Sequence, residues 1–382
     1  MVVLGWWAHY CLLWALGSYC GPGLERLRLL GHATSHGKTR AVSPLDDSMH
    51  INRQVRFVAT VLVSAAFLFF ALRGVEWDRL WVALQDTRWL YVPAIFGTTI
   101  WTLYIRAQRW KVLLHGHGEV PHSIFVHATN IGFMANMVLP LRAGEVIRPV
   151  LLARRSGLPL GAVLASIVLE RVFDLVTVIA IFGVAAMLVP VSVTLQNVGL
   201  LLVALAVGLS VTILVLRWKQ TWILRFWESM APHFPHFAAE PVGHFLRAFL
   251  RALSVLDRPR TFLSLIAWTC YLWSIIALVN ALGLLAFDLV VPLLPATLVV
   301  TAVVALAVSA PSAPGYVGSF QFGCKVALAA YAVDSSTALA FSLVLHVTQF
   351  LATVGAGVVS LALEGMSLRE IEEVGQTDVS PS

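Results

Sequence analysis

Ionisable side chains interrupt a strongly apolar part of the chain between residues 130 and 174. An ionised group at the centre of a membrane-spanning helix costs roughly 2.5 to 3.5 kcal/mol, so such a cluster persists where it faces protein or a polar cavity. The pattern therefore predicts a functional site. Its charged members are Arg142, Glu145, Arg148, Glu170, Arg171 and Asp174.

These side-chain types suit recognition of a phosphate group. The guanidinium of arginine is planar, stays ionised and binds phosphate through two parallel hydrogen bonds. Arg142 and Arg148, with Arg106 and Arg109 nearby in sequence, can therefore hold a lipid phosphate. The carboxylates would orient these arginines or exchange protons with the cavity.

The spacing of the charges leaves a second interpretation open. Arg142, Glu145 and Arg148 share one face if the segment that carries them is helical. Glu170 lies roughly 14 Å into a spanning helix, close to the middle of the membrane. Three arginines and three acidic residues can also neutralise one another. The cluster is then an internal ion-pair network that locks neighbouring helices together.

The composition identifies the kind of protein that must position these residues. Hydrophobic residues make up 59% of the 382 residues and charged residues 12%, whereas soluble domains have about 25% charged residues. We therefore expect an all-α polytopic membrane protein. Its basic residues gather in the loops, which orients the protein in the membrane and gives no reason to expect nucleic acid as a partner.

About six apolar runs are long enough to cross a bilayer, which takes about 20 residues. They cover residues 55–73, 89–106, 161–188, 198–217, 262–285 and 338–363. Two further apolar segments, 122–153 and 292–333, are broken in the middle by Pro, Gly and polar residues. We interpret both as re-entrant hairpins.

Basic residues flank both ends of segment 122–153 and fill the linker 217–260, which places these parts in the cytoplasm. The second broken segment then enters from the outer face. Two hairpins entering from opposite sides are typical of inverted repeats whose interrupted helices meet near the midplane. Because irregular backbone at that depth must be buried or line water, the two breaks predict a shared polar cavity.

The residues of the breaks have distinct expected roles. Pro140 and Gly144 mark the break of the first hairpin. In the second, Pro311, Pro314, Gly315 and Gly318 are expected to supply the fixed and positive φ values of a tight break. Neutral side chains can add hydrogen bonds to a substrate, and the candidates are Asn136, Ser312 and Gln321.

No metal or cofactor is expected. The spacing of His115, His117, His122 and His127 matches no standard zinc pattern, and no cysteine joins them. The sequence also lacks the glycine-rich loop of nucleotide-binding proteins. His346, alone on an apolar span, is interpreted as a hydrogen-bonded core histidine, with proton carriage as the alternative.

The first 48 residues fit poorly with the regular apolar runs after them, because they lack the basic region of a secretory signal and include a polar, unpatterned stretch. We expect translation to start at Met49; the alternative is an additional membrane-associated helix. The expected divisions are a leader at 1–48, a transmembrane domain at 49–363 and a cytoplasmic tail at 364–382. Both termini of a chain starting near Met49 are then cytoplasmic.

Several motifs, taken in order, resemble the lysylphosphatidylglycerol synthase transmembrane-region family of flippase-like proteins. The similarity covers roughly residues 55–363. The motifs are Asn136-x-x-Leu139-Pro140-Leu141-Arg142-Ala143-Gly144-Glu145-x-x-Arg148, Arg154-x-x-Gly157, Glu170-Arg171-x-x-Asp174 and Pro311-Ser312-Ala313-Pro314-Gly315-Tyr316-Val317-Gly318.

The resemblance implies movement of a lipid between leaflets. The soluble aminoacyl-transfer domain of the namesake enzymes has no counterpart in the sequence after Glu364, so lysyl transfer is not expected. Many relatives carry an acidic residue where this chain has Gln321, which argues against a coupling carboxylate in the second hairpin.

We therefore expect a plasma-membrane protein of bacterial type that translocates, or helps to translocate, a phospholipid or other amphiphile with a phosphorylated or polar head group. A second hypothesis is a non-transporting partner that docks a lipid- or glycan-modifying enzyme through the linker 217–260. A third is an enzyme acting on a membrane lipid, with Glu170 or Asp174 as acid or base.

The expected topology can be tested with single cysteines in a cysteine-free chain. Cysteines at Asn197, Asp288 and Asp334 should react from outside with an impermeant thiol reagent, because these positions lie in loops poor in basic residues. A cysteine at Gln220 should be protected in sealed cells. Labelling of Gln220 from outside would contradict the six-span arrangement.

Overall fold

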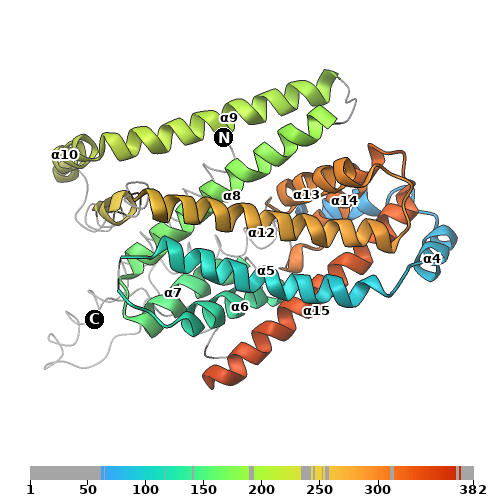
Figure 1. Cartoon of the computed structure of the whole chain (residues 1–382), viewed down its shortest axis with the longest axis horizontal. Coiled ribbons are helices and arrows are strands. Elements are labelled where there is room, and N and C mark those ends of the chain that lie inside the picture. The colour runs from blue at the N-terminus through green and yellow to red at the C-terminus, as the bar shows by residue number, and fades with distance from the viewer. Residues whose placement is uncertain are drawn as a thin grey trace, which may run out of the picture.

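The computed structural model describes residues 62–63, 65–116, 118–139, 142–188, 193–233, 242–243, 246–251, 253, 258–309, 314–366 and 370. Every regular element in these ranges is a helix (Figure 1), which confirms the all-α prediction. Expectations for residues 1–48, Pro140, Pro311 and Ser312 lie outside the described residues.

Three helices are long and apolar enough to cross a membrane: α8 (Leu160–Leu188), α12 (Pro259–Ala286) and α15 (Ser335–Glu364). They coincide with three of the runs expected from the sequence. Helix α9 (Val193–Trp218) covers a fourth. Helix α5 (Tyr91–Leu113) has 23 residues and includes Arg106 and Arg109 in its second half.

Each of the two broken segments forms a pair of helices. The first contains α6 (His122–Val138) and α7 (Gly144–Ser156). The second contains α13 (Leu293–Ser309), the short 3-10 helix η4 (Pro314–Tyr316) and α14 (Ser319–Ala329). Helix α6 ends at Val138 and α7 begins at Gly144, while α13 ends at Ser309 and α14 begins at Ser319.

Glycines bring the helices of each pair into close contact. A Cβ atom on Gly144 would lie 1.8 Å from the carbonyl oxygen of Gly132, and one on Gly132 would lie 2.6 Å from Cβ of Arg148. In the second pair, a Cβ atom on Gly323 would lie 2.9 Å from Cβ of Ala307. Both segments thus fold back on themselves with their backbones nearly touching.

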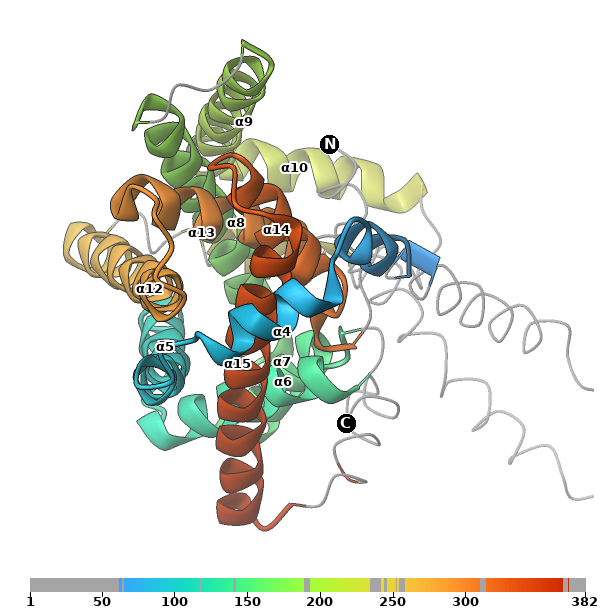
Figure 2. The same ribbon diagram turned by 90° about the vertical axis from the view of Figure 1, so that its right-hand side faces the viewer.

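Helix α15 runs through the middle of the molecule, where it packs against α5, α6 and α14 (Figure 2). Helices α5 and α12 lie side by side (Figure 1), while α8 packs against α13 and α9. Helix α10 (Gln220–Met230) has no buried residue, and α4 (Trp77–Gln85) packs on α15. The helices that carry the charged residues, α5, α7 and α8, therefore meet inside the bundle.

We predict that Gly144→Ala disrupts the first helix pair. The new methyl group has no room beside the carbonyl of Gly132, and overpacking of this kind costs about 1 to 3 kcal/mol or more. The variant should show a lower thermal midpoint in detergent and a lower membrane abundance. Gly97→Ala in α5 is the matched control, since a Cβ atom there meets nothing within 4 Å. Equal behaviour of the two variants would contradict the close contact.

Candidate functional site

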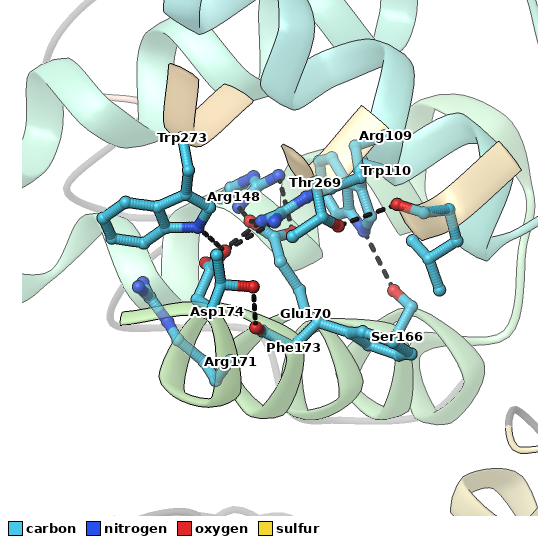
Figure 3. Close-up of polar contacts among 12 residues, drawn as sticks. Arg109, Trp110, Arg148, Ser166, Glu170, Arg171, Phe173, Asp174, Thr269 and Trp273 are labelled. Atoms are coloured by element: carbon cyan, nitrogen blue, oxygen red, sulfur yellow. Dashed lines mark hydrogen bonds and ion pairs between the residues drawn. The ribbon is translucent and has the colours of Figure 1, made fainter. Parts of the chain in front are cut away.

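Arg109 lies at the centre of the charged cluster. Helix α8 presents Glu170 and Asp174 one helical turn apart, facing Arg109 on α5 (Figure 3). Nη1 and Nη2 of Arg109 donate to Oδ1 and Oδ2 of Asp174 at 2.5 and 3.0 Å. Nη2 also lies 3.0 Å from Oε1 of Glu170. One guanidinium thus joins both carboxylates of α8.

Arg148 brings helix α7 into the same cluster. Its two terminal nitrogens donate to Oε1 and Oε2 of Glu170 at 3.3 and 3.2 Å. The guanidinium also lies over the ring of Trp110, 4.0 Å from the centroid, an arrangement that stabilises a cation. Trp273 on α12 donates from Nε1 to Oδ1 of Asp174 at 3.2 Å. Four helices are therefore joined through two carboxylates.

We call Arg109, Arg148, Glu170 and Asp174 the buried network. Their exposed fractions are 0%, 4%, 1% and 8%. Removing one member of a buried ion pair leaves an uncompensated charge and typically costs about 3–5 kcal/mol. For these four residues the geometry agrees with the ion-pair interpretation, in which the charges hold helices together.

Arg106, Glu145 and Arg171 form an accessible edge beside the buried network. Arg171 pairs with Glu145, and 37% of its side chain is exposed. The guanidinium of Arg106 lies 4.8 Å above the ring of Phe133. Among the residues that the structure describes, no carboxylate is within ion-pair distance of Arg106. It interacts with Glu170 and Asp174 only at longer range.

The cluster carries more positive than negative charge. The buried network and the accessible edge together contain four arginines and three carboxylates, and Arg142 lies at the neighbouring break. An excess of cations in a low-dielectric environment favours a negatively charged ligand.

Arg142 occupies the point where the two breaks meet. It precedes α7 and has a φ of 55°. The spacing predicted that Arg142 shares a helical face with Glu145 and Arg148, and this prediction is wrong because the left-handed backbone conformation places Arg142 outside the helix. Its side chain donates to the carbonyl oxygen of Val308, near the C-terminus of α13, and lies 5.2 Å from the ring centroid of Tyr316. A cation at a helix C-terminus is favoured by the helix dipole. Arg142 thus connects the breaks, while Glu170 pairs with Arg109 and Arg148.

A chain of neutral groups also contributes to the second break. The backbone N–H of Gly318 donates to Oε1 of Gln321 at 2.8 Å. Nε2 of Gln321 lies 2.8 Å from Nδ1 of His346, and Nε2 of His346 lies 2.6 Å from the carbonyl oxygen of Gly315. Because a carbonyl oxygen only accepts, the histidine proton is on Nε2 and the amide donates to Nδ1. His346 is therefore a hydrogen-bonded core histidine.

The other residues predicted for the site and for the breaks lie outside the charged cluster. Asn136 is buried near the end of α6, against Gly144, and its Oδ1 has no hydrogen-bond partner in the described part of the chain. Pro314 begins η4, and Gly315 and Gly318 have positive φ angles of 66° and 87°. Ser312 is among the residues that are not described.

Three further residues support the site and were not selected from the sequence. Trp273 bonds Asp174, and Trp110 both stacks on Arg148 and donates to Oγ of Ser166 at 2.9 Å. Their spacing along the chain gave no signal, because these contacts join separate helices. Trp273 lies in the apolar run 262–285 and Trp110 just after the run 89–106, and neither position indicates these partners.

Residues 57–357 match the family described as the lysylphosphatidylglycerol synthase TM region. The chain belongs to this family. A relative from Haloferax volcanii, glycosyltransferase AglD, is 28% identical over 135 residues, which are 35% of this chain and 22% of that protein. The aligned part thus spans about a fifth of the relative. No solved structure matches the chain.

Membership of the lysylphosphatidylglycerol synthase TM-region family confirms the resemblance inferred from the motifs. The match covers every residue of the buried network and of the accessible edge. Together with the three long apolar helices, it identifies a multi-pass membrane protein.

We predict that Arg148 and Glu170 are energetically coupled. Glu170→Gln leaves Arg148 and Arg109 short of a counter-ion and should cost about 3 kcal/mol or more of unfolding free energy. Adding Arg148→Gln restores the charge balance and leaves the Arg109–Asp174 pair intact. The double variant should therefore be more stable than the sum of the single effects predicts, by about 0.5–3 kcal/mol.

Denaturant unfolding of the purified protein in detergent measures this coupling. Arg155→Gln is a control, because Arg155 is 44% exposed in its side chain and pairs with Glu364 away from the network. Strictly additive effects of the two substitutions would show that the pair does not brace the bundle.

Proposed function

We propose that this protein translocates, or assists in translocating, a lipid with a phosphorylated head group across the plasma membrane. The observation that carries the proposal is Arg106, a cation next to a closed ion-pair network with no acidic partner in the described residues. An unpaired arginine inside a membrane protein is expensive, so it is expected to meet an anion during function.

The proposal assigns different roles to the residues of the cluster. The buried network holds α5, α7, α8 and α12 in register. Arg106 and Arg171 at the accessible edge receive the phosphate, because arginine binds phosphate through paired hydrogen bonds. Arg142 contacts the second break through Val308 and Tyr316.

The two broken helix pairs would supply the path. We propose that α6–α7 and α13–α14 are re-entrant hairpins that enter from the cytoplasmic and outer faces, as in inverted repeats. Their breaks are in contact, since a Cβ atom on Gly315 would lie 3.1 Å from the carbonyl oxygen of Met137. The head group would pass between the breaks while the lipid tail stays in the bilayer.

A second candidate function is a membrane scaffold for an enzyme that modifies lipids or glycans. It is supported by the similarity to part of a glycosyltransferase and by the exposure of α10, whose Trp222 and Phe226 are 62% and 55% exposed. In this case loss of α10, and not of Arg106, would remove the activity.

The main proposal predicts the effect of Arg106 substitutions on transport. Arg106→Gln should slow lipid translocation about 10- to 100-fold, the loss expected when a hydrogen bond to a charged group is removed. Arg106→Lys keeps the charge without the planar fork and should give an intermediate rate. Protein abundance should stay near normal, because Arg106 makes no ion pair with the described residues.

Purified protein in phosphatidylcholine vesicles provides the measurement. Fluorescent phosphatidylglycerol and a fluorescent polyisoprenyl phosphate serve as probes, and dithionite quenching reports their exchange between leaflets. Arg155→Gln is the matched arginine control. The proposal fails if neither probe moves faster than in protein-free vesicles, or if Arg106→Gln and Arg155→Gln behave alike.

A further inference from the structure

Tyr316 belongs to the second break but lies beside the charged residues of the first. Its ring centroid is 5.2 Å from the guanidinium carbon of Arg142. Arg106, Glu145 and Arg171 are also within electrostatic range of its hydroxyl. The accessible edge, which comes from α5, α7 and α8, is thus bordered by a side chain of the other broken helix pair.

The hydroxyl of Tyr316 is available to a ligand. It makes no hydrogen bond within the described part of the chain, and it is not one of the fully enclosed polar atoms that lack a partner there. The residue as a whole is half-buried. Because a phenol hydroxyl can donate a hydrogen bond, Tyr316 can donate to an anion that the neighbouring arginines bind.

The backbone holds Tyr316 in an uncommon conformation. Its φ of 60° follows a φ of 66° at Gly315, and a positive φ is unfavourable for a bulky side chain. Oγ of Ser319 donates to the carbonyl oxygen of Tyr316 at 3.0 Å, and Gly315 packs closely on the backbone of Met137 at the end of α6. Unfavourable conformations that the surrounding structure maintains gather at functional sites. These contacts keep the ring of Tyr316 beside Arg142.

The donors and the charge at this place suit a terminal phosphate group. A phosphate monoester has three free oxygens, whereas a diester has two. Arginine binds phosphate oxygens through paired hydrogen bonds, and the Tyr316 hydroxyl adds a donor of another kind. A monoester carries about −1.5 to −2 charges at pH 7. The buried network, the accessible edge and Arg142 contain five arginines and three carboxylates, an excess of two positive charges.

From this geometry we infer that Tyr316 donates to the third oxygen of a phosphate that Arg106 and Arg171 hold, and that it thereby selects lipids with a terminal phosphate over phosphodiester lipids. The inference rests on the proposed function and specifies its substrate class as lipid phosphate monoesters. Since Tyr316 belongs to the second break, selection also requires the two breaks to be in contact while the phosphate is bound.

Binding of two matched probes tests the inference. Full-length protein in phosphatidylcholine nanodiscs is titrated with dioleoyl phosphatidic acid and with dioleoyl phosphatidylmethanol, and the complexes are counted by native mass spectrometry. The two lipids differ by one methyl group, which blocks the third phosphate oxygen. The wild type should bind phosphatidic acid about tenfold more tightly, the scale of one hydrogen bond to a charged group.

Tyr316→Phe removes the hydroxyl and keeps the ring beside Arg142. It should lower the affinity for phosphatidic acid about tenfold, leave the affinity for phosphatidylmethanol unchanged and leave the thermal midpoint in detergent unchanged. Tyr331→Phe is the matched control, because the Tyr331 hydroxyl also lacks a partner in the described residues and follows the far end of α14. Arg106→Gln should weaken binding of both probes by a similar factor, since both present phosphate oxygens to it.

The outcomes separate this inference from the proposed function. Equal wild-type affinity for the two probes overturns the selection of monoesters but leaves phosphate binding intact. Failure of both probes to bind overturns the proposed function as well. A Tyr316→Phe variant that keeps the wild-type preference, or that weakens both probes equally and lowers the thermal midpoint, overturns the assignment of the hydroxyl to the third oxygen.

Discussion

The pairing of Arg109 with two carboxylates is the interaction on which the rest of the bundle depends. A guanidinium with no exposed surface cannot recover its lost hydration from solvent, so its neighbours must supply the compensation. Glu170 and Asp174 do so from one face of α8, and Glu170 also holds Arg148. The relative positions of α5, α7 and α8 are thereby fixed by electrostatics in a fold whose apolar surfaces alone would tolerate sliding.

The same constraint explains why the charges divide into two groups. Every member of the buried network lies in an ion pair with another member, whereas the residues of the accessible edge are partly exposed. A rigid, closed network beside an unpaired cation is the arrangement that preorganises a binding site, because its supporting residues do not rearrange when an anion arrives. Under the proposed function, stability and phosphate binding depend on neighbouring but different arginines.

The sequence predicted the helical class, the interruptions near Gly144 and Gly318 and the charged cluster, because proline, glycine and ionised groups have strong local preferences in a membrane. It did not predict that Arg109 would occupy the centre. Arg109 and Asp174 are 65 positions apart, and their contact depends on how α5 and α8 are rotated against each other. Arg142 differed for a local reason: its left-handed backbone conformation removed it from the helical face assumed for it.

The hydrogen-bonded chain through Gln321 and His346 gives the two breaks different electrical properties. Every link in that chain is neutral, while the first break is adjacent to Arg142 and Glu145. Moving one elementary charge through the full membrane potential involves about 2.3 kcal/mol per 100 mV. A displacement that moved Arg142 apart from Glu145 across the membrane would therefore respond to the membrane voltage, whereas a displacement of the neutral Gly318–Gln321–His346 chain would be electrically silent.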